Sequence, residues 1–455
     1  MSQTLLTAQP TGGAATLASI KAPREIQVSV TELGDDGLGT GRFEGRTVRV
    51  KNGLPGESVT SKVLKKRRGI LYTEASSIVE PSSDRRNSAC DVFPRCGGCV
   101  LHHLDYQAQL KLKEQTLLRA LADAQVTPAS VSAPVYGPRL HYRAKARLGV
   151  RIVGGSTLVG FRETFSSRVA RMDDCKTLTL PLANLLAPLK EVIGRLSVRH
   201  KIPQIELAGG DHEQAIIVRH LEPMQKEDLS LLTNFALESA VRIYLQPKGY
   251  DTIWLLAPTN APRYLHYLNM DFGLCYQFLP ADFIQVNPVI NRMLVRSALS
   301  HLDLQPGERV IDLFCGIGNF SLAAARLGAR VTGYESAAGA VHRARKNAEL
   351  NGLSQAVKFE QTDLYDSSCS ELEEAQFLIL DPPRSGAGEN LIRWLSTDAF
   401  KKLQKVVYVS CNPVTFARDA AMFERFGLKL SKVGIFDMFP HTAHVETLAL
   451  FERRG

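Results

Sequence analysis

The most regular alternation of apolar and polar segments lies in the C-terminal third of the chain. From about residue 290, short apolar runs alternate with segments long enough for a helix. Buried parallel strands separated by helices produce this pattern. Strands with one solvent-exposed face instead alternate apolar and polar residues. We therefore expect a doubly wound α/β domain over residues 286–455. Its strands are expected at 309–313, 330–334, 356–359, 376–380 and 406–409, with an edge hairpin formed by 428–436 and 445–451.

The N-terminal pattern is different, because short alternating runs are separated by turn residues. Residues 26–30 alternate, the glycine-containing segment 34–41 follows, and 47–50 is another short run. Even spacing of this kind predicts a small antiparallel, OB-like β-barrel over residues 23–83. The preceding residues 1–22 lack the charged start and apolar centre of a signal peptide, so we expect a disordered leader there.

Residues 84–285 combine helical and strand-like patterns, and we expect them to form a mixed α+β domain. A helix is expected at 106–122. Further on, Arg143, Lys145 and Arg147 alternate with small and apolar residues, and a strand would place these three cations on one face.

The net charge narrows the range of partners. The 455-residue chain carries a formal charge of +9, which suits a polyanion such as RNA but also describes a merely basic protein. Five cations cluster at Lys62, Lys65, Lys66, Arg67 and Arg68, where they form either a solvated surface or an RNA contact. The sequence has no apolar run long enough to span a bilayer, and eight cysteines do not make a disulfide scaffold. We expect a cytoplasmic monomer with reduced thiols and no obligate protein partner.

Glycines and acidic residues follow the expected strands of the C-terminal domain. Gly316 and Gly318 come directly after the first strand. Four carboxylates stand at or after consecutive strand ends: Asp312, Glu335, Asp363 and Asp381. Because the carboxyl ends of parallel strands share one edge of a sheet, we expect a ligand pocket there. The loop lacks the third glycine of a dinucleotide fingerprint, and acidic residues suit a cationic sulfonium cofactor better than a phosphate-bearing one.

Two residues near the same edge are candidates for chemistry. Cys411 follows the fifth strand close to an expected helix N-terminus, a position that can lower the pKa of a thiol. A free cysteine is most often a packing residue, but the position beside Asp381 favours a nucleophile. Glu446 lies in the closing hairpin, where the pattern alone favours an exposed strand residue over a general base. No third metal ligand accompanies His441 and His444, so we interpret them as structural or substrate-contacting residues.

A separate group of cysteines precedes the expected central helix. Cys90, Cys96 and Cys99 are closely spaced, and Cys175 stands alone further along the chain. Three clustered thiols with a distant fourth can bind zinc or an iron–sulfur cluster, and the spacing alone does not choose between the two metals.

Taken together, these motifs resemble the RNA uracil-C5 methyltransferases, from about residue 24 to the end of the chain. The resemblance implies an N-terminal TRAM domain, which is an RNA-binding barrel, and a central iron–sulfur domain. It also implies a C-terminal class I methyltransferase domain that uses S-adenosylmethionine. The segments that carry the resemblance include 283–287 (FIQVN), 410–413 (SCNP) and 444–446 (HVE).

The resemblance assigns a role to each matching residue. Cys90, Cys96, Cys99 and Cys175 match the four ligands of a [4Fe-4S] cluster. The contacts to S-adenosylmethionine are implied at Gln285, Phe314, Asn319, Glu335, Asp363 and Asp381. Cys411 matches the nucleophile and Glu446 matches the base, which reverses the interpretation of Glu446 as a surface residue.

The implied reaction is formation of 5-methyluridine in RNA. Cys411 adds to C6 of a flipped-out uracil, C5 takes the methyl group, and Glu446 removes the C5 proton. The combination of barrel and cysteine cluster is that of the branch acting on 23S ribosomal RNA, and the same reaction on transfer RNA or at another 23S site is the nearest alternative. A non-catalytic RNA-binding or iron–sulfur module is a second alternative, which the motif context of Cys411 and Glu446 disfavours. Methylation of DNA or of cytosine is a third, and the absence of a Pro-Cys motif weighs against it.

Overall fold

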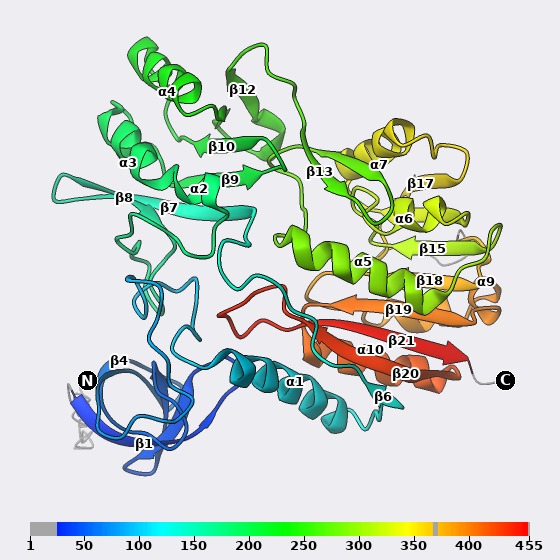
Figure 1. Cartoon of the computed structure of the whole chain (residues 1–455), viewed down its shortest axis with the longest axis horizontal. Helices are drawn as coiled ribbons and strands as arrows, with labels where there is room; N and C mark the ends of the chain where they lie inside the picture. Colours follow the sequence, from blue (N-terminus) through cyan, green and yellow to red (C-terminus); the bar gives the residue numbers. More distant parts are fainter. Residues whose placement is uncertain (1–24, 367–371, 454–455) are drawn as a thin grey trace, which may run out of the picture.

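The computed structural model describes residues 25–366 and 372–453. The expected leader at 1–22 lies outside the described residues. The chain forms an N-terminal barrel, a central sheet with helices, and a C-terminal sheet with helices on both faces (Figure 1). None of the described helices combines the length and hydropathy needed to cross a membrane.

The N-terminal barrel is closed, as the alternating pattern predicts. Ile26, Val28 and Val30 point inward on the first strand, while the residues between them are exposed. The strand order is β1-β2-β3-β5-β4, and all neighbours are antiparallel except β3 and β5. The strands are β1 (Glu25–Leu33), β2 (Gly39–Phe43), β3 (Arg46–Lys51), β4 (Ser58–Arg67) and β5 (Ile70–Ile78).

The central sheet has six strands in the order β12-β11-β10-β9-β7-β8, and one face is covered by helices. On β7, Ala146 and Leu148 point into the core below those helices, and Arg147 points to the other face, as the alternation predicts. The strands are β7 (Lys145–Val153), β8 (Ser156–Gly160), β9 (Gln204–Gly209), β10 (Gln214–Arg219), β11 (Arg242–Gln246) and β12 (Trp254–Ala257). The helices are α2 (Leu180–Ala183), α3 (Leu186–Arg195) and α4 (Lys226–Glu238), with single 3-10 turns η1 (Arg199–Lys201) and η2 (Tyr250–Thr252).

The C-terminal sheet confirms the expected doubly wound arrangement. Its strand order is β17-β16-β15-β18-β19-β21-β20-β6, in which β17 to β19 are parallel and β21 is antiparallel to both neighbours. The C-terminal hairpin does close one side of the sheet, but its second strand, β21, lies inside and its first strand, β20, outside. The strands are β15 (Arg309–Leu313), β16 (Arg330–Glu335), β17 (Val357–Gln361), β18 (Phe377–Leu380), β19 (Lys405–Ser410), β20 (Leu428–Phe436) and β21 (Glu446–Arg453).

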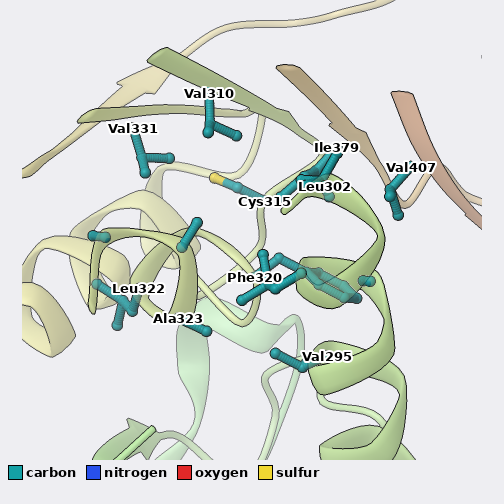
Figure 2. Close-up of a cluster of buried hydrophobic side chains, with 14 of the residues drawn as sticks. Val295, Leu302, Val310, Cys315, Phe320, Leu322, Ala323, Val331, Ile379 and Val407 are labelled. Atoms are coloured by element: carbon teal, nitrogen blue, oxygen red, sulfur yellow. The ribbon is translucent and has the colours of Figure 1, made fainter. Parts of the chain in front are cut away.

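Helices cover both faces of this sheet, so its central strands are buried on both sides. Figure 2 shows one face, where Val310, Val331, Ile379 and Val407 meet a helical layer that includes Leu302. That layer contains α5 (Pro288–Leu302), α6 (Ser321–Arg326) and α7 (Ala338–Leu350). The hairpin of β13 (Leu265–Asn269) and β14 (Leu274–Phe278) packs beside α7. The opposite layer contains α8 (Asn390–Leu395), α9 (Asp398–Lys401) and α10 (Pro413–Arg425).

Two elements from the expected central segment join the C-terminal sheet instead of the central one. Helix α1 (Tyr106–Asp123) packs against α10 and β20, and Leu117 and Leu121 enter the same hydrophobic layer. The short strand β6 (Ser130–Val131) pairs in parallel with β20 at the edge of the sheet. The chain therefore crosses the C-terminal domain once before it builds the central sheet (Figure 1).

Candidate functional site

The glycine-containing loop after β15 turns sharply beneath the carboxyl end of β16. Phe314, Gly316 and Gly318 all have positive φ angles of 64°, 55° and 91°. The backbone N–H of Gly316 donates to the Glu335 carboxylate at 3.2 Å, and the N–H of Ala337 donates to its other oxygen at 2.9 Å. The last residue of β16 is thereby fixed beside the loop, at the carboxyl edge of the sheet where open α/β sheets bind ligands.

Gln285 and Asp381 meet at this edge although 96 residues separate them. The Gln285 amide donates to the Asp381 carboxylate at 3.3 Å. Burial raises the pKa of Asp381 to about 7, although the hydrogen bond from Gln285 acts in the opposite direction. A carboxylate held in this state is ready to pair with a cation or to donate a hydrogen bond when protonated.

Asn319 is held by two residues that no sequence motif indicates. Its amide forms a reciprocal pair with the Asn291 amide at 2.9 and 3.0 Å, and the Tyr267 hydroxyl also donates to it at 3.3 Å. These partners lie on α5 and β13, and ordinary Asn and Tyr positions carry no signal for such a contact. The orientation of the Asn319 side chain is therefore set by α5 and β13.

Two of the four expected acidic positions differ sharply in burial. Asp312 is fully buried inside β15 and accepts a hydrogen bond from the Ser321 hydroxyl, so it stabilises the fold beneath the loop. Burial raises its pKa to about 7. Asp363 is exposed and accepts from the Tyr365 backbone, while the Tyr365 ring lies against Phe314 at a centroid distance of 5.7 Å.

Cys411 and Glu446 lie opposite each other at the end of one strand ladder. The antiparallel register pairs Ser410 with Thr447, so the next residue on each side is Cys411 and Glu446. Paired residues in an antiparallel ladder point to the same face of the sheet. The Glu446 side chain is 3% exposed, so the interpretation from pattern alone as a surface residue is wrong.

The protonation of these two groups follows from their burial and from each other. Burial raises the pKa of Glu446 well above its ordinary value, and the Asp381 charge raises it further. Burial and then the Glu446 charge raise the pKa of Cys411, and the Arg384 guanidinium only partly opposes them. The expectation that the N-terminus of α10 lowers the pKa of this thiol is therefore wrong for the protein without ligands. Desolvation is the largest cause of the raised pKa.

A pocket of about 490 Å³ opens beside Cys411. One wall is formed by Arg384, Asn412 and His444 from the C-terminal domain. The other wall comes from α1, through Thr116 and Arg119, and Asp35 of the barrel contributes to its rim. The C-terminal domain, helix α1 and the barrel therefore all line the pocket beside Cys411. No local sequence signal indicates that these three regions meet.

The four cysteines of the expected metal site approach one another from two separate segments. Burial raises the pKa of Cys96 to about 11, and the charges of Cys175 and Cys90 contribute to that shift. Burial also raises the pKa of Cys99, with the same neighbours contributing. In residues 25–366 and 372–453, however, no group of three or more His, Cys, Asp or Glu side chains has a geometry that holds a metal ion.

Glycines allow the close contact between these two segments. The N–H of Gly97 donates to the carbonyl of Arg162 at 2.8 Å, and a Cβ at position 97 would lie only 2.8 Å from that oxygen. A Cβ at Gly98 would meet the Phe161 ring at 3.2 Å. Gly97 and Gly98 thus allow the loop that carries Cys96 and Cys99 to lie against residues 161–162.

Comparison with known sequences identifies the family. The sequence model of the family described as tRNA (Uracil-5-)-methyltransferase matches residues 105–454, and that of the TRAM domain matches 23–75. The chain belongs to the uracil-C5 methyltransferase family. The match covers well over half of the chain and includes the whole ladder that carries Cys411 and Glu446.

Individual members of the uracil-C5 methyltransferase family match nearly the whole chain. The 23S rRNA (uracil(1939)-C(5))-methyltransferase RlmD of Hahella chejuensis is 41% identical over 444 residues, which cover 95% of this chain and 98% of the relative. The protein of the same name from Nitrosospira multiformis is 39% identical over 435 residues, which cover 94% and 98%. Among solved structures, the Pyrococcus abyssi tRNA (uracil-54, C5)-methyltransferase in complex with S-adenosyl-L-homocysteine is similar, with 25% identity, a TM-score of 0.71 and coverage of 94% and 100%.

The electrostatic coupling at the site predicts the pH dependence of thiol reactivity. Because Cys411 has a raised pKa, its alkylation by iodoacetamide should accelerate as the pH rises and the thiolate fraction grows. Replacing Glu446 by Gln removes a neighbouring negative charge, so the acceleration should begin at a lower pH. Peptide mass spectrometry of protein alkylated at a series of pH values measures this for each cysteine. Cys275 is the internal control, and an unshifted Cys411 profile in the Glu446→Gln protein would contradict the coupling.

Proposed function

We propose that this protein forms 5-methyluridine at a specific uracil of 23S ribosomal RNA, with S-adenosylmethionine as the methyl donor. The observation that carries the proposal is the position of Cys411 opposite Glu446 at the end of the β19–β21 ladder. Both residues border the edge where Asp381, Gln285 and the loop after β15 meet. A nucleophile, a buried carboxyl group and a cofactor edge in one place fit methyl transfer to a pyrimidine carbon.

The chemistry assigned to the protein's own residues follows from the weak nucleophilicity of uracil C5. The Cys411 thiolate adds to C6, and the electron pair of the C5–C6 double bond moves toward C5 and the O4 carbonyl. When bound, S-adenosylmethionine supplies an electrophilic methyl group. Glu446 then takes the proton from C5, the electrons of that C–H bond re-form the C5–C6 double bond, and the sulfur of Cys411 leaves C6.

Asp381 and Arg384 are placed to bind the uracil ring. The pKa of Asp381 near 7 leaves it partly protonated at neutral pH, so it can donate a hydrogen bond to a ring carbonyl or accept one from N3–H. Arg384 lies beside Cys411 and contacts the His444 ring at 3.4 Å. Its positive charge also suits the enolate oxygen that forms when the thiolate adds.

For S-adenosylmethionine, we propose contacts from six residues around this edge. The carboxylate of Glu335 suits the ribose hydroxyls, and Phe314 offers an aromatic face next to Tyr365. The acidic edge also suits the positive charge of the sulfonium. The set is Gln285, Phe314, Asn319, Glu335, Asp363 and Asp381.

The ribosomal substrate is favoured by the relatives that match both ends of the chain. The ribosomal enzymes are 39–41% identical, whereas the transfer-RNA enzyme of known structure is 25% identical. All of them share the reaction at uracil C5 by name, so the choice concerns the RNA and not the chemistry. Action on ribosomal RNA also places the protein in the cytoplasm, where we propose that it works as a monomer.

The barrel supplies RNA affinity in this proposal. Lys62, Lys66, Arg67 and Arg68 are exposed on β4 and the following turn, where they can contact phosphates. Lys65 has a different role, because its ammonium lies 4.2 Å from the centroid of the Phe165 ring in the central region. This cation–π contact holds the barrel against the central region. Four of the five clustered cations therefore remain available to RNA.

We further propose that Cys90, Cys96, Cys99 and Cys175 bind a structural [4Fe-4S] cluster. The support is the convergence of the four thiols from segments that are 76 residues apart, with Cys175 buried and the other three partly buried. Arg143 lies close enough to Cys99 to lower its pKa, and such a cation offsets the negative charge of thiolate ligands. A cluster here ties 84–101 to 160–177, within the domain that we expect over 84–285.

The substrate proposal is tested with RNA lacking the modification. Purified enzyme and methyl-tritiated S-adenosylmethionine should label 23S ribosomal RNA from cells without this gene, and nuclease mapping should place the label in a single 5-methyluridine. Ribosomal RNA from wild-type cells is the matched control and should accept no label, because the site is already methylated. Labelling of unmodified transfer RNA, with none in 23S ribosomal RNA, would transfer the proposal to the alternative substrate.

The covalent mechanism is tested with one substitution at each residue. Cys411→Ala should abolish methylation, because C5 is never activated. Glu446→Gln should allow thiol addition and methyl transfer but stall before proton removal, which leaves a methylated protein–RNA adduct. The adduct appears as a slow, tritium-labelled band that resists denaturation, and the double variant should lack it. Full turnover without adduct in Glu446→Gln would remove Glu446 from the role of base.

The metal proposal is tested on protein purified without oxygen. We expect about four iron atoms and four sulfides per chain with a broad absorbance in the visible range. Cys175→Ser should lower the iron content and the thermal midpoint, because one of the two segments is released. Cys275→Ser is the matched control, since this free thiol lies outside the group. Stoichiometric zinc without iron would contradict the assignment.

A further inference from the structure

Helix α1 presents an unusual set of polar side chains to the protein interior. Tyr106, Gln109 and Lys113 lie on one face of the helix, and Gln109 and Lys113 are only 1% and 2% exposed. A helix packed on a sheet normally buries apolar residues on that face. Buried polar groups are costly unless they are paired, so their partners indicate what the helix must hold.

All three side chains contact the loop that connects β20 to β21. Lys113 donates to the Asp437 carboxylate at 2.5 Å and to the Phe439 carbonyl at 2.9 Å. The Tyr106 hydroxyl donates to the other oxygen of Asp437 at 2.7 Å. Asp437 is 1% exposed, so this ion pair is fully enclosed.

Gln109 holds the middle of the same loop. Its amide oxygen accepts from the backbone N–H of His441 at 3.0 Å, and its amide nitrogen lies 3.3 Å from the ring nitrogen Nδ1 of His441. The backbone N–H groups of Val100 and Leu101 also donate to the His441 carbonyl at 3.0 Å. The His102 ring stacks on His441 at a centroid distance of 4.0 Å. These contacts leave the loop little freedom between residues 437 and 441.

The contacts between α1 and this loop lie directly beside the carboxyl group that we propose as the base. The last pair of the β20–β21 hairpin is Phe436 with Glu446, so Asp437 is the next residue after the partner of Glu446. The far end of the loop carries His444, which contacts Arg384 at 3.4 Å. Movement of the loop would therefore displace Glu446 relative to Cys411.

We propose that Lys113, Asp437 and Tyr106 are positioning residues that align Glu446 for removal of the C5 proton. The inference rests on the proposed covalent mechanism and extends it to residues that touch neither substrate nor cofactor. Loss of the contacts of Lys113 and Tyr106 with Asp437 leaves the steps of thiol addition and methyl transfer intact, because Cys411 is held by β19 and by the N-terminal cap of α10. It slows the final step, so the methylated adduct persists longer.

The readout is the ratio of methyl label in the denaturation-resistant adduct to label in released 5-methyluridine. A merely structural loss lowers both quantities together and leaves this ratio unchanged. Misplacement of a catalytic group by about 1 Å can cost on the order of a hundredfold in rate. We expect the ratio to rise about tenfold or more in the double variant Lys113→Met, Asp437→Leu, which removes both charges and leaves no buried ion unpaired.

Tyr106→Phe is the milder variant, and Tyr408→Phe is its matched control. Each substitution deletes a 2.7 Å hydrogen bond from a buried tyrosine to a buried aspartate, Asp437 in one case and Asp419 in the other. Tyr106→Phe should raise the adduct ratio about twofold to fivefold, in line with loss of one of several contacts. Tyr408→Phe should keep the wild-type ratio even where its thermal midpoint falls by the same amount.

The outcomes separate this inference from the mechanism on which it rests. A wild-type ratio in folded Tyr106→Phe and in the double variant would overturn the positioning role, provided that Glu446→Gln accumulates methylated adduct. No methylated adduct in Glu446→Gln would overturn the covalent mechanism, and the positioning role with it. An equal rise in Tyr408→Phe would also overturn the inference, because general loosening of the sheet would then explain it.

Discussion

The antiparallel insertion of β21 beside β19 is the constraint on which the site depends. In a parallel sheet every strand presents its last residues to the ligand edge, and only strand ends can carry the chemistry. Because β21 runs the other way, it presents its first residue instead. Glu446, which begins one strand, therefore lies near Cys411, which follows another, and the ladder pair Ser410–Thr447 lies directly beside both. Two side chains on flexible loops could not hold this relation as closely.

The connection between β20 and β21 is longer than the two residues that an antiparallel hairpin needs. Residues 437–445 form this connection, and α1 and the segment around Leu101 hold it from outside the C-terminal domain. The barrel reaches the same place, since a Cβ at Gly37 would lie 3.3 Å from Cβ of Ala443. The barrel, helix α1 and the C-terminal domain thus lie together beside the residues that we propose as nucleophile and base.

The sequence predicts the strands of the C-terminal sheet well because strands buried on both faces must be apolar throughout. For the same reason the burial of Glu446 could not be predicted from the sequence. The first six residues of β21 are all buried, so no alternation of apolar and polar residues marks which side chains point inward. Lys113 is concealed for another reason. Its position fits the helical periodicity of an interior face, and a lysine there indicates solvent unless its partner is known. Asp437, that partner, lies 324 residues away, so local pattern cannot reveal the pair.

The protonation states of three acidic side chains at the site depend on burial and on neighbouring charges. Cys411, Glu446 and Asp381 are three neighbouring acids with raised pKa values. Burial raises all three, the Asp381 charge also raises the pKa of Glu446, and both carboxylates raise that of Cys411. A raised pKa lowers the fraction of Cys411 that is thiolate, the nucleophilic form. A cation bound at this edge lowers all three pKa values. The positive charge of the sulfonium cofactor that we propose would thus favour both the thiolate and the ionised base.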